Sequence, residues 1–215
     1  MIIAIDGPSA SGKGTLARQL ARRLDFAHLD TGSLYRGVAL LVLDAGGRPQ
    51  DAAAAIKAAK GFSLEILNDR RIRSEATGEA ASHVAAIPGV RAELLAFQRR
   101  FAAAPPGGKK GAVIDGRDIG TVVCPEADLK FFVTASPEVR AERRTKELLA
   151  RGEAANPAQV LATIRERDRR DQRREASPLR AAEDAHLLDT TKLDIDGAFQ
   201  KALDVLASKG FLKTK

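Results

Sequence analysis

The first fifteen residues, MIIAIDGPSASGKGT, restrict the possible fold of this chain more than any other stretch. Residues 2–5 are all apolar, which is typical of a strand buried on both faces. Gly7, Gly12 and Lys13 then fit the pattern G-x-x-x-x-G-K, and residues 16–24 have the apolar periodicity of a helix. A strand, a glycine-rich loop and a helix in this order predict a phosphate-binding loop.

Such a loop binds phosphate because its backbone N–H groups point inward and the following helix adds partial positive charge. Lys13 supplies a full charge where the β- and γ-phosphates of a nucleotide would lie. Gly14 stands where many phosphate loops have the Ser or Thr that binds Mg²⁺, and the hydroxyl of Thr15 comes one residue later. The nucleotide-binding residues predicted here are Gly7, Pro8, Ser9, Ala10, Ser11, Gly12, Lys13, Gly14 and Thr15.

The bulk composition narrows the classes of function. With 215 residues the chain is long enough for one α/β domain, or for one domain with an insertion. The net charge of +7 favours anionic partners, but with 4% aromatic residues and no Trp the chain is poorly equipped to stack nucleic-acid bases. We therefore expect small polyanionic substrates and no nucleic acid.

The sequence carries no signal for a membrane or for secretion. No apolar run approaches membrane-spanning length, and the first residues lack the features of a signal peptide. The single cysteine, Cys124, excludes an internal disulfide and suits a reducing compartment. We expect a cytoplasmic monomer without a membrane partner. The three histidines, which we expect to be structural because they show no metal-ligand spacing, are His28, His83 and His186.

Strand and helix patterns alternate along the chain, as in a doubly wound parallel sheet. Buried strands are predicted at residues 2–5, 26–29, 112–115, 129–133 and 186–189, and helices at residues 34–43, 51–60, 78–87, 90–104, 137–149, from 157 onward and at 195–207. We assign residues 1–45 and 105–215 to the core of a single domain and residues 46–104 to an insertion that moves independently. Within this insertion, residues 62–67 alternate like a half-exposed strand, and residues 72–74 are predicted to pair back with them.

Polar residues follow the predicted strands where ligands bind. In a doubly wound sheet the loops at the carboxyl ends of the strands line the ligand crevice, which places Asp30, Asp115, Arg117 and Asp118 beside the phosphate loop. Asp115 also has the position of an acid that orders the waters on Mg²⁺. The segment that begins at Thr31 predicts an anion site at a helix N-terminus, although an ordinary helix cap is an alternative interpretation.

Two predicted helices are rich in arginine. Residues 137–149 carry arginines at i, i+3 and i+4, and residues 165–174 contain six arginines and three acids. A mixed-charge helix is usually a solvated face. Arginine fills every basic position in residues 165–174, however, and it is suited to bidentate phosphate contact. We therefore predict that residues 140–175 contain a lid that closes over the transferring phosphates and excludes water.

Six motifs resemble bacterial cytidylate kinase, a nucleoside monophosphate (NMP) kinase family. These motifs are GPSASGKGT (7–15), DTGSLYR (30–36), SHVAAIPGVR (82–91), DGRDIGTVV (115–123), ERDRRDQRR (166–174) and LLDTT (187–191). The resemblance implies an α/β fold with a P-loop NTPase-like parallel sheet flanked by helices, an inserted NMP-binding subdomain and an arginine-rich helical lid. It also implies ATP-dependent phosphorylation of CMP or dCMP with Mg²⁺. The segment 46–81 is shorter than we expect for this family.

The resemblance further implies roles for individual residues. A carboxylate such as Asp118 accepts from the amino group of cytosine, while Arg91 and Ser82 donate to its ring acceptors. Uracil reverses two of these polarities. The implied roles are the α-phosphate of the acceptor for Thr31, Arg36, Arg117 and Arg174; the base for Ser82, Arg91 and Asp118; the sugar for Tyr35 and Asp171; and catalysis near the donor phosphates for Lys13, Arg143, Arg144, Arg167 and Arg170.

Three other functions stay open at this point. The first is another small-molecule kinase of the same fold, which would act on AMP, UMP or a non-nucleotide acceptor; residues 115–118 speak against it. The second is a GTPase, because residues 191–194 match the [NT]-K-x-D guanine signature, but Gly14 replaces the metal-binding hydroxyl. The third is a nucleic-acid-binding ATPase, which predicts stimulation by DNA or RNA and a steep salt dependence.

Overall fold

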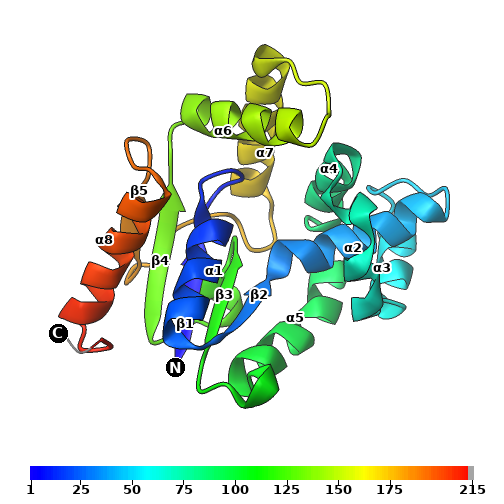
Figure 1. The fold of residues 1–215 in the computed structure, drawn as a ribbon. Coiled ribbons are helices and arrows are strands. Elements are labelled where there is room, and N and C mark those ends of the chain that lie inside the picture. The colour runs from blue at the N-terminus through cyan, green and yellow to red at the C-terminus, as the bar shows by residue number, and fades with distance from the viewer. Residues whose placement is uncertain (213–215) are drawn as a thin grey trace.

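The computed structural model describes residues 1–212 and has a five-stranded parallel sheet at its centre (Figure 1). The order of the strands is β2-β3-β1-β4-β5, so the strand that precedes the glycine-rich loop is the central one. This arrangement confirms the predicted parallel α/β sheet. The strands are β1 (Ile2–Asp6), β2 (Ala27–Asp30), β3 (Ala112–Gly116), β4 (Leu129–Thr134) and β5 (His186–Asp189).

The helices begin and end close to the predicted positions, and polar residues cap several of them. Asp30, Asp51 and Asn156 each accept backbone N–H groups at a helix start. Short η turns occupy parts of the connections. The helices are α1 (Lys13–Leu24), α2 (Thr31–Asp44), α3 (Ala52–Lys60), α4 (Glu75–Val84), α5 (Pro88–Ala103), α6 (Pro137–Ala150), α7 (Pro157–Arg173) and α8 (Ile195–Ser208), and the turns are η1 (Leu64–Asn68), η2 (Arg70–Arg73), η3 (Pro106–Gly108) and η4 (Ile119–Val123).

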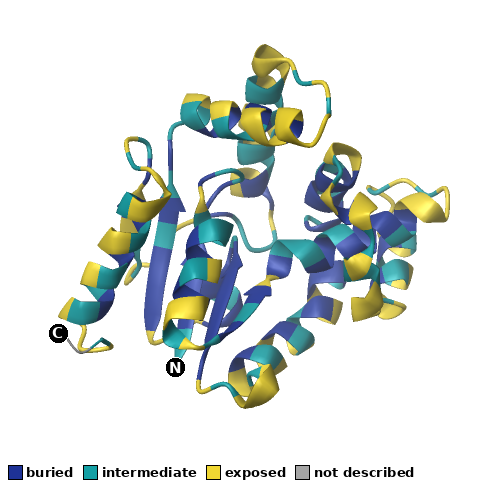
Figure 2. Ribbon diagram, viewed as in Figure 1, coloured by how far each residue is buried: buried dark blue, intermediate teal, exposed yellow. Residues whose placement is uncertain are grey.

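The hydrophobic core has two layers, one on each face of the sheet. Ile3 and Ile5 belong to the layer that contains residues of α1 and α8, whereas Ala4 belongs to the layer formed with α2, α4 and α5. This alternation follows from the two-residue period of a strand, and it explains why every residue of the β1 apolar run is covered. Figure 2 shows the sheet as buried and the outer faces of the helices as exposed. Within residues 1–212 no helix combines the length and the apolar character that a bilayer crossing requires.

The two strands predicted inside the insertion are wrong. Residues 62–67 and 72–74 instead lie in and around η1 and η2, because Ser63 and Asp69 accept the backbone N–H groups that start each turn. The apolar side chains of Phe62 and Ile66 pack against α2 at Gly37, where an added Cβ would lie 2.5 Å from the Phe62 ring. Phe62 and Ile66 are therefore covered by a helix and not by a partner strand, and Leu64 between them is 49% exposed. Helix α4 also begins three residues before the prediction, since Ser74 caps it.

Helices α6 and α7, which we call the lid, stand above the carboxyl edge of the sheet (Figure 1). Helix α4 of the insertion lies beside them. Ion pairs join the two parts, from Arg144 to Glu75 and from Arg170 to Glu79 at 2.7 Å. The lid, the insertion and the sheet edge therefore enclose one region, and the phosphate-binding loop opens into it.

Candidate active site

The glycine-rich loop has the backbone that its sequence predicts. At Gly7 an added Cβ would lie 2.0 Å from the Val133 carbonyl oxygen, so no other residue fits there. Gly12 has a φ of +91° at the start of α1, and Ala10 has a φ of +58°, which is uncommon outside glycine. Strained residues of this kind persist where the surrounding structure holds them, and they are frequent in ligand-binding loops. The loop is a preformed turn at the N-terminus of a helix, which suits an anion.

Lys13 is half-buried, and its ammonium group donates to the Pro8 carbonyl at 3.4 Å. Desolvation, followed by repulsion from Arg117, lowers the pKa of Lys13 to about 7, although Asp115 and Asp30 act in the opposite direction. A nearby polyanion would favour the charged form of this lysine. The side chain is thus poised to gain a proton when phosphates arrive.

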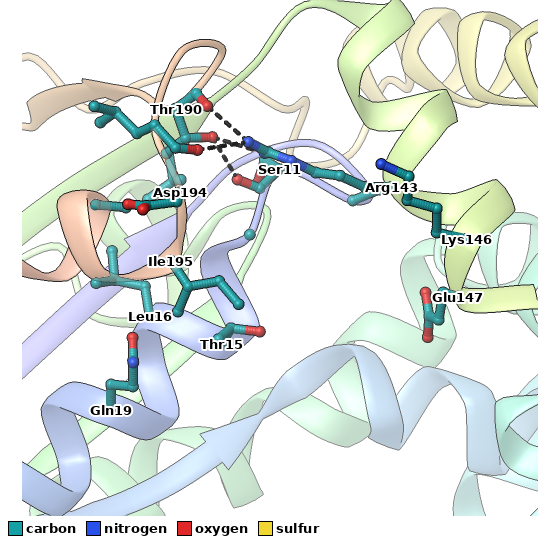
Figure 3. A pocket seen from close by; sticks show the side chains of 15 residues that line it. Ser11, Thr15, Leu16, Gln19, Arg143, Lys146, Glu147, Thr190, Asp194 and Ile195 are labelled. Carbon is teal, nitrogen blue, oxygen red and sulfur yellow. Dashed lines mark hydrogen bonds between the residues drawn. The ribbon is translucent and has the colours of Figure 1, made fainter. Parts of the chain in front are cut away.

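A cavity of about 620 Å³ opens beside the loop, between α1, α6 and the segment that joins β5 to α8 (Figure 3). Arg143 of α6 spans it and donates to the carbonyls of Thr190 and Leu193 at 2.7 and 3.1 Å. The Thr190 hydroxyl in turn donates to the Ser11 carbonyl at 3.0 Å. This volume matches a ligand of nucleotide size. The other lining residues are Ala10, Gly12, Thr15, Leu16, Gln19, Val133, Lys146, Glu147, Asp194, Ile195 and Ala198.

A second, much smaller cavity of about 50 Å³ lies between α2, α4, the loop after β3 and the end of α7. It gathers residues that are distant in the sequence, and eight of the nine predicted acceptor-binding residues line it. The ninth, Arg36, lines an adjoining space with Arg144 and Arg167. The eight residues are Thr31, Tyr35, Ser82, Arg91, Arg117, Asp118, Asp171 and Arg174.

Carboxylate groups form ion pairs with the arginines of this second cavity. Asp118 pairs with Arg91 and lies 3.7 Å from Arg174, and all three side chains are buried. Asp171 accepts from Arg117 at 3.0 Å. Because these pairs fill the space, a nucleotide would have to exchange its own phosphate and base groups for them.

Several buried polar atoms in the cleft have no hydrogen-bond partner among the described residues. Three of them belong to residues that line the second cavity, namely the Ser82 hydroxyl, Nε of Arg167 and Nη2 of Arg174, and the fourth is Nε of Arg170, which α4 holds at the rim. Buried polar groups are nearly always hydrogen-bonded, so unpaired ones in a single cleft indicate a ligand that pairs with them. All four are donors, and a ligand rich in acceptor oxygens would pair with them.

The electrostatics of the cleft also favour an anion. Desolvation and the neighbouring Arg117 lower the pKa of Arg167 to about 10. The pKa of Arg174 is lowered by desolvation and by Arg91, and that of Arg36 by desolvation and by Arg144. In each case the two largest effects disfavour the charged form, so positive charge is concentrated beyond what the local carboxylates neutralise. Bound phosphates would compensate for it.

The three arginines that α6 carries at i, i+3 and i+4 have different environments. Arg143 lines the large cavity, Arg144 pairs with Glu75, and Arg140 is 3% exposed and turned inward. Arg140 forms a two-pronged pair with Asp168 of α7 at 2.6 and 3.0 Å and also donates to the Ser9 carbonyl at 3.3 Å. It thereby connects both lid helices to the phosphate-binding loop. We had no sequence signal that separated Arg140 from its two neighbours.

Replacing Arg140 by methionine should lower the free energy of unfolding by about 3 kcal/mol, because the mutation leaves the Asp168 carboxylate largely buried without its partner. Urea unfolding followed by circular dichroism measures the change. Arg165 is the matched control, since its pair with Glu138 is exposed, and Arg165→Met should leave the urea midpoint unchanged. An equal effect of both substitutions would contradict the structural role of Arg140.

The lid arginine Arg170 differs from its predicted neighbours in the cleft. It pairs with Glu79 and contacts the His83 ring at 2.6 Å, so α4 holds it at the rim. Glu75 and Glu79 therefore belong to the surroundings of the site. No local pattern indicates this, since nothing in the sequence separates these two acids from other surface acids.

Comparisons with known proteins show the family of this chain. The model of the family described as "Cytidylate kinase" matches residues 3–208. A cytidylate kinase of Paramagnetospirillum magneticum is 59% identical over 208 residues, which cover 97% of this chain and 98% of that protein. A cytidylate kinase of Rhodopseudomonas palustris is 56% identical over 206 residues, covering 96% of this chain and 95% of the relative.

The solved structures bear on the fold alone. A crystal structure of an uncharacterized protein from Eubacterium ventriosum is similar with a TM-score of 0.57 at 16% sequence identity. The match covers 97% of this chain and 99% of that chain. The overall fold thus has a counterpart among known structures.

Proposed function

The chain belongs to the cytidylate kinase family, and from this premise we propose that it transfers the γ-phosphoryl group of ATP to CMP or dCMP. The products are ADP and the corresponding cytidine diphosphate. The observation that carries the proposal is the cluster of unpaired arginine and serine donors beside Asp118, one cavity away from the phosphate-binding loop. Such a cluster offers partners for a phosphate and for a base with both an amino group and acceptor atoms.

ATP is the donor, and we assign it to the 620 Å³ cavity. Its phosphates would follow the backbone N–H groups of residues 7–15 toward Lys13, and its base would lie near Leu193 and Ile195. Asp194 caps α8 by accepting from Gly197 at 2.7 Å, so this part of the guanine-like signature has a structural use. This structural role supports the interpretation that the match to the guanine signature arises by chance.

CMP is the acceptor, and we assign it to the second cavity. Asp118 would accept from the amino group of cytosine, while Arg91 and Ser82 would donate to its ring nitrogen and carbonyl oxygen. The phosphate would be bound by Thr31, Arg36, Arg117 and Arg174. The sugar would lie next to Tyr35 and Asp171. Support comes from the position of eight of these residues in one cavity and from the unpaired Ser82 hydroxyl.

The protein contributes mainly positioning and positive charge to the transfer. In-line displacement requires little covalent help from the protein. The charge on the transferring phosphoryl group would be stabilised by Lys13, Arg143, Arg144, Arg167 and Arg170. The residual cavity of about 50 Å³ is too small for a nucleotide, so the insertion 46–104 and the lid would separate on binding and close again. Closure excludes water and limits hydrolysis of ATP.

Residues at the edge of the sheet fit Mg²⁺. Asp30 and Asp115 are register partners at the carboxyl ends of β2 and β3, and Asp115 Oδ2 would lie 3.6 Å from a Cβ at Gly14, at the start of α1. Carboxylate and hydroxyl oxygens suit this ion, so Asp30, Asp115 and Thr15 would hold it directly or through waters. When bound, Mg²⁺ neutralises charge on the phosphates.

A coupled assay of ADP formation with ATP, Mg²⁺ and one acceptor at a time tests the proposal. We expect turnover with CMP and dCMP, and at least about tenfold lower kcat/KM with UMP and AMP, because mismatched buried polar groups cost free energy. A preference for UMP or AMP would support the alternative kinase. ATP hydrolysis that DNA or RNA stimulates, without turnover of CMP, would support the nucleic-acid-dependent ATPase.

ATP binding should take up a proton at pH 8. In the free protein the pKa of Lys13 is about 7, so the amine is mostly neutral at pH 8, whereas the bound polyphosphate raises this pKa and restores the charge. The affinity for MgATP should therefore fall as the pH rises above 7. Calorimetry in two buffers of different ionisation enthalpy measures the uptake, which should be small at pH 6.

The matched control for this measurement is Lys13→Arg, which keeps the charge at both pH values and should abolish the uptake at pH 8. Equal proton uptake in the wild type and in Lys13→Arg would show that another group titrates.

A further inference from the structure

Asp6 is a buried carboxylate that the proposed mechanism does not use. It is the last residue of β1 and is 4% exposed. Its two oxygens accept the backbone N–H groups of Ile119 and Gly120, each at 2.8 Å. These two residues begin the η4 turn, which directly follows Arg117 and Asp118 in the chain. The central strand of the sheet is therefore bonded to the loop that carries the base-recognition residues.

The η4 turn is not capped by the side chain of the residue that precedes it. Asp118 occupies the N-cap position with φ −145° and ψ 26°, and its side chain makes no capping hydrogen bond. An aspartate in this position ordinarily accepts the N–H groups that follow it, which is one of its most favourable local arrangements. Here the Asp118 carboxylate instead pairs with Arg91 inside the acceptor cavity. Of the N–H groups that an N-cap side chain can reach, that of Gly120 is held by Asp6 instead.

We propose that Asp6 is a positioning residue for base selection: it caps the η4 turn from β1 and thereby leaves the Asp118 carboxylate free to read the pyrimidine. This inference rests on the proposed function, since the base is read at Asp118. Without Asp6, the buried N–H groups of Ile119 and Gly120 lose their acceptors. Asp118 is the N-cap residue of the same turn, so its side chain is the one that local geometry would offer to the Gly120 N–H.

The surroundings of Asp6 explain why a carboxylate is needed. A Cβ added at Gly120 would be in ordinary contact with Asp6 Oδ2 at 3.5 Å and in tight contact with the Lys130 side chain at 3.0 Å. Lys130 pairs with Asp184 at 2.9 Å, so the Asp6 charge is balanced chiefly by the two N–H groups. Burial raises the pKa of Asp6 to about 7, and both hydrogen bonds oppose this rise. An asparagine offers one acceptor oxygen and would turn its amide N–H₂ toward a backbone donor.

The test is a double-mutant cycle with Asp6→Asn and Asp118→Asn, read as kcat/KM for CMP and for UMP and as KM for ATP. We expect Asp6→Asn to lower kcat/KM for CMP by about tenfold, to lower it less for UMP, and to leave KM for ATP unchanged. In the Asp118→Asn background, the same Asp6→Asn substitution should change the CMP/UMP ratio by less than twofold. If the effect of Asp6→Asn on the CMP/UMP ratio disappears in this background, the two residues are coupled and Asp6 acts through Asp118.

Asp128 provides a matched control, because its carboxylate accepts the Ile2 backbone N–H at 2.6 Å at the opposite end of β1. Asp128→Asn should leave the CMP/UMP ratio unchanged. Circular dichroism reports whether each variant folds, and Asp6→Ser, which keeps one acceptor, replaces Asp6→Asn if the latter does not.

Three results would overturn the inference. These are a proportional loss for CMP and UMP in Asp6→Asn, an additive cycle, or the failure of both Asp6 variants to fold, which would assign Asp6 to the stability of the sheet. The proposed function fails separately, if the wild-type protein forms no ADP with CMP.

Discussion

Replacing Lys13 by alanine is expected to lower kcat/KM for CMP phosphorylation by about 10³-fold or more. The ammonium group is the one cation placed by the loop itself, at the N-terminus of α1, and a preorganised charge of this kind acts on the transition state rather than on binding alone. The loss should appear mainly in kcat, because the backbone of the loop still binds the phosphates. Steady-state kinetics with saturating MgATP measures it.

The control for this variant is Lys57→Ala, which removes an exposed lysine of α3 and should leave turnover unchanged. Lys13→Ala should also retain the wild-type circular dichroism spectrum, since Lys13 makes a single long hydrogen bond to Pro8. Turnover within about tenfold of the wild type would remove Lys13 from the catalytic residues.

Asp118→Asn should reduce kcat/KM for CMP by about 100-fold and should reduce it much less for UMP. The amide turns a donor toward the amino group of cytosine, and each unpaired buried group costs about 1–3 kcal/mol. Uracil offers a carbonyl oxygen at the same position, and the asparagine N–H₂ can donate to it. The ratio of the two kcat/KM values therefore reports base recognition independently of any general loss.

An equal loss for both substrates would show that Asp118 acts by holding Arg91 and Arg174 and not by reading the base. Asp44→Asn is the control for the change of charge, because Asp44 forms an exposed pair with Arg71 far from the cavity. It should leave the activity with both pyrimidines unchanged.

The elements that local sequence specifies were predicted well. The sheet strands are short apolar runs between polar turns, and every predicted sheet strand agrees with the structure to within one residue at each end. The error in the insertion has a physical reason. Phe62, Leu64 and Ile66 alternate as in a strand, but Phe62 and Ile66 are also four residues apart, a spacing that lets a helical turn pack both onto a neighbouring helix. Only the presence or absence of a partner strand distinguishes a strand from such a turn.

The candidate site was predictable to different degrees. The loop 7–15 is continuous in sequence, so its glycine pattern was sufficient. The acceptor cavity draws on residues 31–36, 82–91, 117–118 and 171–174, and nothing in their local patterns joins them. The resemblance to a known family supplied that connection. Asp6 and Asp168 carried no signal, because a carboxylate acquires a role from the N–H or guanidinium group that folding brings to it.

The sequence by itself therefore determined the phosphate-binding loop, the individual strands and the family, since these depend on residues close along the chain or on motifs in a fixed order, and the alternation of strands with helices indicated that the sheet is parallel. Only the tertiary structure decided which arginine faces the cleft and which supports it. Arg140, Arg143 and Arg144 have the same residue type and lie on one helix face, yet one is buried against Asp168, one lines the donor cavity and one pairs with Glu75. Charge and helical spacing do not specify a partner, because the partner comes from a different element of the fold.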